Sequence, residues 1–253
     1  YVNGKLLAEH HCGYTAFVVD LTKALLFDED NVLVICVDSR EQQNIPPFGH
    51  VIDYMTFGGL YREVYIEVKE ETSIADVFAQ AQNVMSSSPK LACEVSLQLE
   101  KRETLTPQKI HENMTKLSQK QLCVRQSILD KETREVIKEY PENELLHDAD
   151  KLIRWDIECP KLYVLQTKLY REDELVDMRE DVIGIREAQF RTDGFYLNDK
   201  KVKIRGLNRH QSYPYVGYAM PKSMQRFDAE ILKKELGVNA VRTSHYPQSH
   251  DFL

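Results

Sequence analysis

The chain has 253 residues, a length that exceeds one ordinary domain and fits two or three. Hydrophobic residues make up 42% of it and charged residues 29%, which is the balance of a globular protein. The formal net charge is −7 and no dense Lys/Arg stripe is present, so a nucleic-acid partner is disfavoured. No run of eighteen apolar residues exists, so we expect no membrane span.

The cysteine pattern argues against a covalent or metal framework. The five cysteines are scattered, odd in number and without any C-x-x-C spacing: Cys12, Cys36, Cys93, Cys123 and Cys159. Disulfide-rich domains and structural zinc sites need paired cysteines at short spacings. We therefore expect reduced cysteines packed in the core.

Residues 1–70 have the composition of β-strands. Asn3-Gly4 lies between apolar flanks and predicts a tight hairpin turn, because both turn positions require a positive φ. The β-branched runs at 15–22 and 31–39 have strand length, and residues 60–68 alternate apolar and polar side chains. These patterns predict part of a β-sandwich or jelly roll.

Residues 71–188 are also predicted to be β-structure. The segments 92–100, 116–130 and 162–172 read as strands, and polar links lie between them. Several short strands at a spacing of roughly ten residues suggest an immunoglobulin-like sandwich.

The pattern changes over residues 189–253. A hairpin and strand at 194–206 are followed by a helix at 222–237, whose apolar residues share one face, and by a short buried strand at 238–245. Ser223 is the expected N-cap and Gly237 the expected left-handed residue at the C-terminus. Strand, helix and strand in this order predict a βαβ unit, most economically the truncated start of a (β/α)₈ (TIM) barrel.

Polar side chains gather where the two strands of this unit end. Asn208, Arg209 and His210 follow the first strand, whereas Arg242, Ser244 and His245 follow the second. Parallel strands end at one edge of a sheet, and in barrels the working residues lie there. These residues could form a floor for a hydroxyl-rich or anionic ligand. A hydrogen-bonded rim without a ligand is an equally weighted alternative.

Four ordered segments carry a family resemblance. GIREAQF…GFYLNDKKVKIRGLNRHQSYP…VNAVRTSHYP resembles the barrel start of glycoside hydrolase family 2, which includes β-galactosidases, β-glucuronidases and β-mannosidases. GYTAFVVDLTKAL…DNVLVICVDSR is similar to the family's sugar-binding jelly roll, and DYMTFGGLYREVYI to the segment that closes it. RWDIECPKLYVLQTKLY resembles its immunoglobulin-like domain. The resemblance implies a mainly β chain with three parts, 1–70, 71–188 and 189–253, and it leans toward β-galactosidase.

The resemblance also implies roles for four residues. In similar β-galactosidases, the histidines matching His210 and His245 line the subsite for the nonreducing sugar. The arginine matching Arg242 supports the nucleophilic carboxylate, and the aspartate matching Asp53 reaches sugar hydroxyls from the jelly roll. A solvated loop carboxylate remains the alternative for Asp53.

The catalytic carboxylates are not expected within this chain. Retaining glycosidases use two carboxyl groups about 5–5.5 Å apart. The resemblance implies that both are glutamates on later barrel strands, beyond Leu253. The one Asn-Glu pair, Asn143-Glu144, precedes the barrel and is not expected to act. The chain alone is therefore predicted to be inactive, with a β-galactoside as the substrate of its parent. The alternative hypothesis, from a different functional class, is a noncatalytic carbohydrate-binding protein built from β-sandwiches.

Further expectations follow from the resemblance. No cofactor or metal is expected within this chain; for the full-length enzyme, the resemblance implies the use of Mg²⁺ or Na⁺. For the full-length protein, a homo-oligomer is the expected state. A cytoplasmic location is favoured, and a periplasmic one stays open because the chain begins at Tyr1 rather than at a methionine.

Overall fold

The computed structural model describes residues 1–40, 42–45, 54–99 and 101–253. Its chain divides into two compact units. The sandwich unit comprises 67–204, and the barrel-start unit comprises 1–66 together with 205–253. The domain boundaries predicted at residues 70 and 188 stay predictions.

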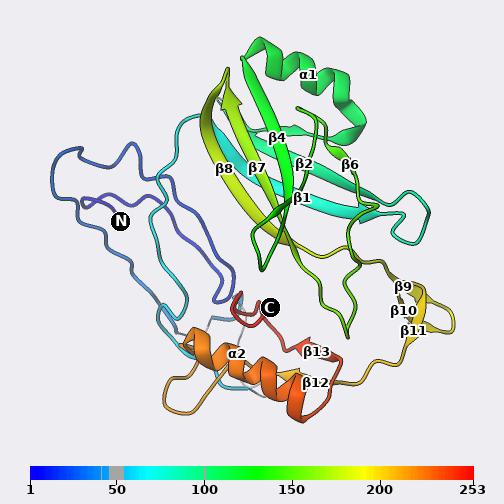
Figure 1. Ribbon diagram of the computed structural model, residues 1–253. Coiled ribbons are helices and arrows are strands. Elements are labelled where there is room, and N and C mark those ends of the chain that lie inside the picture. The colour runs from blue at the N-terminus through cyan, green and yellow to red at the C-terminus, as the bar shows by residue number, and fades with distance from the viewer. Residues whose placement is uncertain (41, 46–53, 100) are drawn as a thin grey trace. The chain divides into compact units, whose positions relative to one another are not determined.

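Two antiparallel sheets form the sandwich unit (Figure 1). In the first sheet, β2 pairs with three strands; in the second, β4 and β7 are central. The first sheet contains β1 (Ser73–Gln82), β2 (Lys90–Gln98), β3 (Glu103–Leu105) and β6 (Leu146–Asp148). The second contains β5 (Val136–Glu139), β4 (Leu122–Asp130), β7 (Tyr163–Arg171) and β8 (Glu174–Ile183). The predicted sandwich is confirmed.

The hydrophobic core of this unit lies between the two sheets. Strand alternation directs every second side chain inward, and Val124 and Ile128 of β4 and Leu165 and Leu169 of β7 are buried in this way. Residues of β1 and β2, among them Ile74 and Leu97, belong to the same buried cluster. Each such side chain contributes about 1.5–3 kcal/mol of transfer free energy.

One helix interrupts the predicted all-β pattern. The short 3₁₀ turn η2 (Pro107–Lys109) leads into α1 (Ile110–Gln119), so the strand predicted to begin at 116 begins instead at Leu122. Asn113 and Leu117 lie four residues apart and are both buried, as neighbours on one helical face can be. The Asn113 amide donates a hydrogen bond to the Thr106 carbonyl at 2.6 Å. This single polar–apolar pair is too weak a periodic signal to reveal the helix in the sequence.

A small meander closes the sandwich unit. It consists of β9 (Ala188–Arg191), β10 (Gly194–Leu197) and β11 (Lys200–Val202), all antiparallel. Asn198 and Asp199 form the turn between the last two strands, and both have a positive φ (49° and 62°). The predicted hairpin is confirmed.

The barrel-start unit contains the predicted βαβ arrangement. Strand β12 (Gly206–Arg209) pairs in parallel with β13 (Ala240–Thr243), and between them lie α2 (Lys222–Glu230) and the π-helical turn η3 (Ile231–Glu235). Gly237 has φ +60° and ends the helical segment as expected. The predicted cap is wrong: Pro221 occupies the N-cap position in place of Ser223, and no side chain caps the helix there.

The remaining part of this unit forms few ladders. Asn3-Gly4 makes the predicted turn, with positive φ at both residues and a bridge between Val2 and Lys5. The strands predicted at 15–22, 31–39 and 60–68 do not form as ladders among the described residues, apart from a single bridge between Val2 and Leu33. β-Branched composition favours an extended backbone, whereas a strand also needs a partner.

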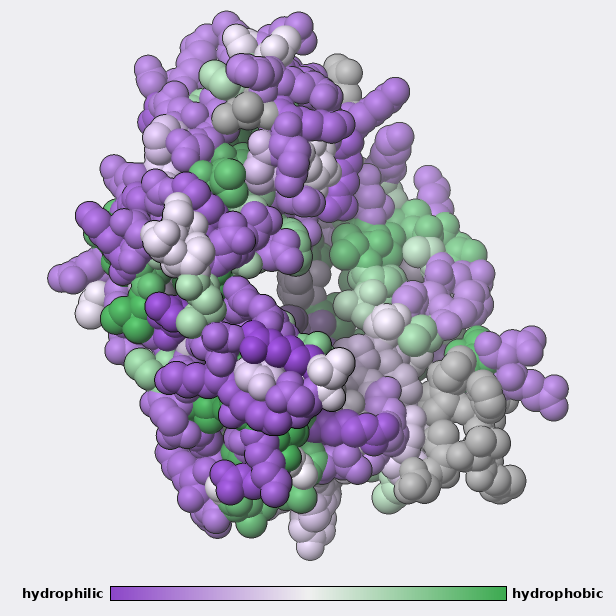
Figure 2. All heavy atoms as spheres, turned by 90° about the vertical axis from the view of Figure 1, so that its right-hand side faces the viewer, coloured by the Kyte–Doolittle hydropathy of each residue, from purple (hydrophilic) through white to green (hydrophobic). Residues whose placement is uncertain are grey.

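Many apolar side chains of these extended segments are exposed. Val18 is 98% exposed, and Val68, the second residue of the sandwich unit, is 92% exposed. Figure 2 shows hydrophobic residues reaching the surface in several patches between hydrophilic ones. The prediction for cysteines is wrong in part, since Cys93 is buried but Cys36 and Cys159 are exposed; all five are free thiols. Within the described ranges, no helix is long and apolar enough to cross a membrane.

Candidate functional site

The parallel register of β12 and β13 brings the two predicted histidines together. Asn208 pairs with Arg242 and Arg209 pairs with Thr243, so both strands end at the same edge of the sheet. The rings of His210 and His245 lie 5.5 Å apart between centroids, at 79° to each other. His210 is half-buried and His245 is exposed. The peptide bond between Ser244 and His245 is cis. Neither imidazole is sealed in an apolar interior, so both are available to a ligand.

Arg209 does not lie on the rim beside the two histidines. The prediction that placed its side chain there is therefore wrong. Successive side chains of a strand point to opposite faces, so Arg209 points away from the face of its neighbours. Its guanidinium is buried and bonds Asp228 of α2 at 2.8 and 3.0 Å. It also donates to Gln225 and Gln248, and it lies 3.9 Å from the ring centroid of Phe252. Arg209 therefore fastens β12 to the helix and to the last turn of the chain.

The other predicted rim residues lie beside the histidines in the chain and differ in burial. Ser244 is buried, and its backbone amide donates to the Arg209 carbonyl at 3.2 Å. Arg242 is exposed and donates a hydrogen bond to the Ser244 hydroxyl at 3.3 Å. Asn208 is exposed on β12. With respect to the described residues, the Arg242 guanidinium has further donors that can face a carboxylate or a polar ligand.

Tyrosines line the histidine pair and were not among the predicted site residues. The Tyr54 ring lies 5.1 Å from His210 and 5.7 Å from His245, between centroids. Tyr246 lies 5.7 Å from Tyr54 and stacks on Tyr14 at 4.9 Å. One feature of the sequence could have indicated two of them: Tyr54 directly follows the predicted Asp53, and Tyr246 directly follows His245. Aromatic rings beside imidazoles give a site an apolar wall as well as polar contacts.

Three tyrosines in and beside this cluster, Tyr14, Tyr61 and Tyr218, have raised pKa values. Burial, with a hydrogen bond to Tyr54 as the next cause, raises the pKa of Tyr14. Burial likewise raises the pKa of Tyr218, followed by its hydrogen bond with Tyr246. The pKa of Tyr61 is also raised, chiefly by burial. These groups can therefore donate and accept hydrogen bonds but do not carry charge.

A buried polar clamp joins the loop at 54–62 to the segments that carry the histidines. Gln211 is buried; its carbonyl oxygen accepts from the Arg62 guanidinium and from the backbone amide of Ser249, the latter at 3.2 Å. Its amide nitrogen donates to the Pro247 carbonyl at 3.1 Å. Arg62 also donates to the Tyr218 carbonyl at 3.1 Å. Residues distant in sequence are thus held beside the imidazoles.

Two expectations receive no structural account. Asp53 lies outside the described residues, so its predicted contact with a sugar stays a prediction. Among the described residues, no group of three or more His, Cys, Asp or Glu side chains is arranged to hold a metal ion. The expectation about Mg²⁺ or Na⁺ therefore stays a prediction.

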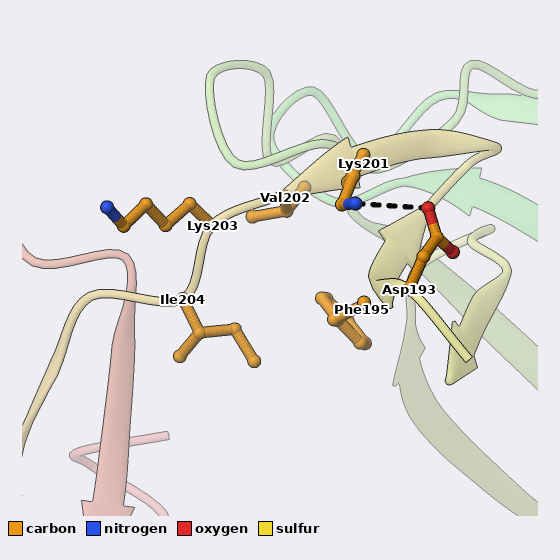
Figure 3. Close-up of a pocket in the computed structure, with 7 residues that line it drawn as sticks. Asp193, Phe195, Lys201, Val202, Lys203 and Ile204 are labelled. Atoms are coloured by element: carbon orange, nitrogen blue, oxygen red, sulfur yellow. Dashed lines mark hydrogen bonds and ion pairs between the residues drawn. The ribbon is translucent and has the colours of Figure 1, made fainter. Parts of the chain in front are cut away.

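A hollow in the sandwich unit is a weaker candidate. It has a volume of about 600 Å³ and lies beside β10 and β11 (Figure 3). Phe195, Val202 and Ile204 line it, and its carboxylate, Asp193, is paired with Lys201 at 3.0 Å. A sugar needs several directed hydrogen bonds, but the walls of this hollow are largely apolar and its carboxylate is already paired with a lysine. We therefore place the candidate site at the histidine pair of the barrel-start unit.

Comparison with known families matches both parts of the chain. Residues 63–186 match the model described as glycosyl hydrolases family 2, and residues 188–253 match the TIM barrel domain of the same family. The chain belongs to glycoside hydrolase family 2.

The curated relatives include glycosidases of two kinds. A β-galactosidase of Thermoanaerobacter pseudethanolicus is 40% identical over 255 residues, which cover 100% of this chain and 33% of the relative. A β-glucuronidase of Bacteroides fragilis is 28% identical over 259 residues, covering 98% of this chain and 36% of the relative. The chain spans about a third of the length of these relatives.

A solved structure agrees with the family assignment. The β-glucuronidase of Bacteroides uniformis superposes with a TM-score of 0.80 at 27% identity, covering 100% of this chain and 30% of that one. The mainly β architecture, with an immunoglobulin-like domain followed by the start of a TIM barrel domain, is therefore the family's architecture.

Proposed function

We propose that this chain is part of a retaining glycoside hydrolase, a β-galactosidase, that removes terminal β-D-galactosyl residues from carbohydrates. The observation that carries the proposal is the 40% identity to a β-galactosidase across the whole chain. The convergence of His210 and His245 on one sheet edge supports it, because a pyranose needs directed donors and acceptors for its hydroxyls.

The described residues suit the binding of one sugar ring. The imidazoles of His210 and His245 can each exchange a hydrogen bond with a hydroxyl, and the Tyr54 ring beside them can cover the apolar C–H face. Arg242, exposed at the same edge, can orient a carboxylate. Contacts that strengthen as the ring flattens toward an oxocarbenium ion lower the barrier rather than only KM.

The proposal places the two catalytic carboxyl groups outside residues 1–253. The Asn143-Glu144 pair does not supply one, because it belongs to the sandwich unit, where Asn143 accepts a hydrogen bond from the Val124 amide at 2.8 Å. The chain alone is expected to bind a sugar weakly and to hydrolyse nothing. For the parent we propose a β-galactoside as ligand, a cytoplasmic location and a homo-oligomeric state.

The proposal is tested in two steps. The chain labelled with ¹⁵N-histidine is titrated with methyl β-D-galactoside, and the His210 and His245 resonances should shift with a millimolar dissociation constant. Methyl β-D-mannoside is the matched control. The parent enzyme is then assayed with nitrophenyl glycosides, and cleavage of the galactoside should dominate. Equal response to all sugars, or turnover by the chain alone, would refute the proposal.

A β-glucuronidase is the second candidate. The observation that favours it is the TM-score of 0.80 with the enzyme of Bacteroides uniformis. A glucuronide carries a carboxylate that needs a cationic partner, whereas a galactoside does not. Preferential cleavage of nitrophenyl β-glucuronide by the parent would select this function, and a mannoside preference would select a β-mannosidase.

A further inference from the structure

The two imidazoles of the candidate site are flanked by cross-links on both sides. Before them in the chain, at the end of the β12–β13 ladder, the Ser244 backbone amide donates to the Arg209 carbonyl at 3.2 Å. After them, Gln211 directly follows the first histidine, and its amide nitrogen donates at 3.1 Å to the carbonyl of Pro247, two residues beyond the second histidine. The 5.5 Å spacing of the two rings is therefore held from both sides.

The amide of Gln211 also holds the loop that carries Tyr54. At the end of this loop, the Arg62 guanidinium donates to the Gln211 carbonyl oxygen and to the Tyr218 carbonyl, the latter at 3.1 Å. At its start, the Met55 carbonyl accepts from the Tyr218 hydroxyl at 2.7 Å. The Tyr54 ring, whose centroid lies 5.1 Å from that of the first imidazole, is thus fixed on both sides as well.

The three bonds of Gln211 require the polarity of an amide. Its side chain is 1% exposed, and its carbonyl oxygen faces two donors, the Arg62 guanidinium and the Ser249 backbone amide, while its nitrogen faces the Pro247 carbonyl. A carboxylate at this position would keep the two donors, but its second oxygen would face a carbonyl with no proton between them. Glutamate would therefore preserve the link to the loop and break the link between the two strand ends.

We propose that Gln211 is a positioning residue: its amide sets the spacing of His210 and His245 and holds Tyr54 beside them, so that three rings meet one sugar. A binding site loses affinity when the contacts that support its side chains let them drift. The spacing follows from the described residues alone, whereas the sugar as ligand rests on the proposed function.

Gln211→Glu separates positioning from stability. The introduced carboxylate gains a charge-assisted bond from Arg62, so exchange of the 206–211 amides should stay close to that of the wild type. The nuclear Overhauser effect between the ring protons of His210 and His245 should nevertheless weaken, and affinity for methyl β-D-galactoside should fall about tenfold. Wild-type affinity in the folded variant would overturn the proposal. Affinity lost only in proportion to stability would also overturn it.

Arg62→Ala tests the link to the loop. This variant leaves the bond between Gln211 and Pro247 in place, so the Overhauser effect between the two imidazoles should persist. The effect between the rings of Tyr54 and His210 should weaken, because the end of the loop is released. Loss of the imidazole contact with an intact tyrosine contact would contradict the assigned roles of the two links.

A second buried glutamine of the unit provides the matched control. Gln225 of α2 is also 1% exposed, and its carbonyl oxygen accepts from the Arg209 guanidinium at 2.7 Å. Gln225→Ala removes a buried arginine–glutamine bond that does not flank the histidines, so the ring contact and the galactoside affinity of the folded chain should stay those of the wild type. Gln211→Ala should reduce both. Equal losses in the two variants would mean that general stability, rather than Gln211, sets the spacing.

Two results separate this inference from the proposed function. A ring contact that is lost in Gln211→Glu, in a chain whose wild type does not bind methyl β-D-galactoside, would refute the galactosidase assignment and leave the positioning role standing. An intact ring contact in Gln211→Glu, together with galactoside binding by the wild type, would refute the positioning role and leave the proposed function standing.

Discussion

The two units of the chain are stabilised in different ways. In the sandwich unit, two antiparallel sheets enclose a contiguous apolar cluster that includes Ile74, Leu97 and Leu165. In the barrel-start unit, the described ladder of β12 and β13 is four residues long, and many apolar side chains of residues 15–37 are exposed. Polar side chains link its segments instead, above all Arg209, Gln211 and the tyrosines.

The difference shows where each unit is vulnerable. A contiguous apolar core distributes its free energy over many contacts, and one truncation removes only a part. A unit linked by a few buried polar groups loses a large share when one partner is removed, because the remaining groups stay buried without compensation. The four predictions below test this contrast, beginning with the largest effect.

Arg209→Ala should give the largest loss of stability. The guanidinium is buried and bonds Asp228, Gln225 and Gln248, so its removal leaves three polar groups without a partner. We expect a loss of about 4 kcal/mol, in the range for a broken buried ion pair. The measurement is hydrogen exchange by mass spectrometry of peptides covering 206–211 and 222–230.

An exposed ion pair of the same unit serves as the control. Arg40 and Asp38 form a bidentate contact at the surface, in which the Arg40 side chain is 87% exposed. Water replaces both partners at such a site, so Arg40→Ala should leave the exchange rates unchanged. Equal effects of the two substitutions would contradict the view that buried polar links hold this unit.

Leu165→Ala tests the sandwich unit. This side chain is fully buried on β7, and its truncation should cost about 3 kcal/mol through lost transfer free energy and a cavity. Trp155 is the only tryptophan of the chain and lies in the sandwich unit, so its fluorescence reports urea unfolding of that unit. Val18→Ala, at the exposed site of the other unit, should leave the midpoint of that transition unchanged.

Acidification should destabilise the sandwich unit through His147. This histidine is fully buried, stacks on Tyr140 at 3.8 Å, and its Nε2 donates to the Gln126 carbonyl oxygen at 2.6 Å. Its Nδ1 has no partner among the described residues. Burial, aided by the charge of Lys138, lowers the pKa of His147 to about 4.

The sign of the pH dependence follows from that direction. Between the folded pKa of about 4 and the ordinary value of 6.5, the unfolded chain binds the proton and the folded chain does not. The contribution of His147 is therefore complete above pH 6.5 and falls as the pH is lowered, by about 2 kcal/mol near pH 4.5. Urea unfolding monitored by Trp155 measures this loss. His147→Gln should flatten the slope, whereas His111→Gln, at an exposed site of α1, should not. The same slope in both variants would show that another group is responsible.

Local signals in the sequence predicted the elements whose partners are near in the chain. The βαβ unit follows from the periodicity of 222–237 and from Gly237, and the hairpin of β10 and β11 from its polar turn. The proximity of His210 and His245 follows from the rule that neighbouring parallel strands end at the same edge of the sheet. These inferences need only one or two adjacent segments.

The rest depended on segments that meet across the chain. Residues 31–39 have strand composition, yet composition does not supply a pairing partner. Arg209 was assigned to the rim although strand alternation already separates it from His210. The tyrosine cluster combines Tyr14, Tyr54 and Tyr246 from three distant segments, and no spacing in the sequence shows that they meet.

The smallest predicted effect concerns the close approach of β12 to β13. A Cβ atom at Gly206 would lie 2.7 Å from the carbonyl oxygen of Ala240, the residue that pairs with Gly206 in the parallel ladder. Gly206→Ala should therefore cost about 1–2 kcal/mol, less than the loss of Arg209, because the short ladder can shift to relieve the contact. Gly13→Ala meets nothing within 4 Å and restricts the unfolded chain, so it should be neutral or stabilising by less than about 1 kcal/mol. Exchange of the β12 and β13 amides measures both. Faster exchange in Gly13→Ala than in Gly206→Ala would mean that the strand contact does not limit this unit and that its polar links alone set its stability.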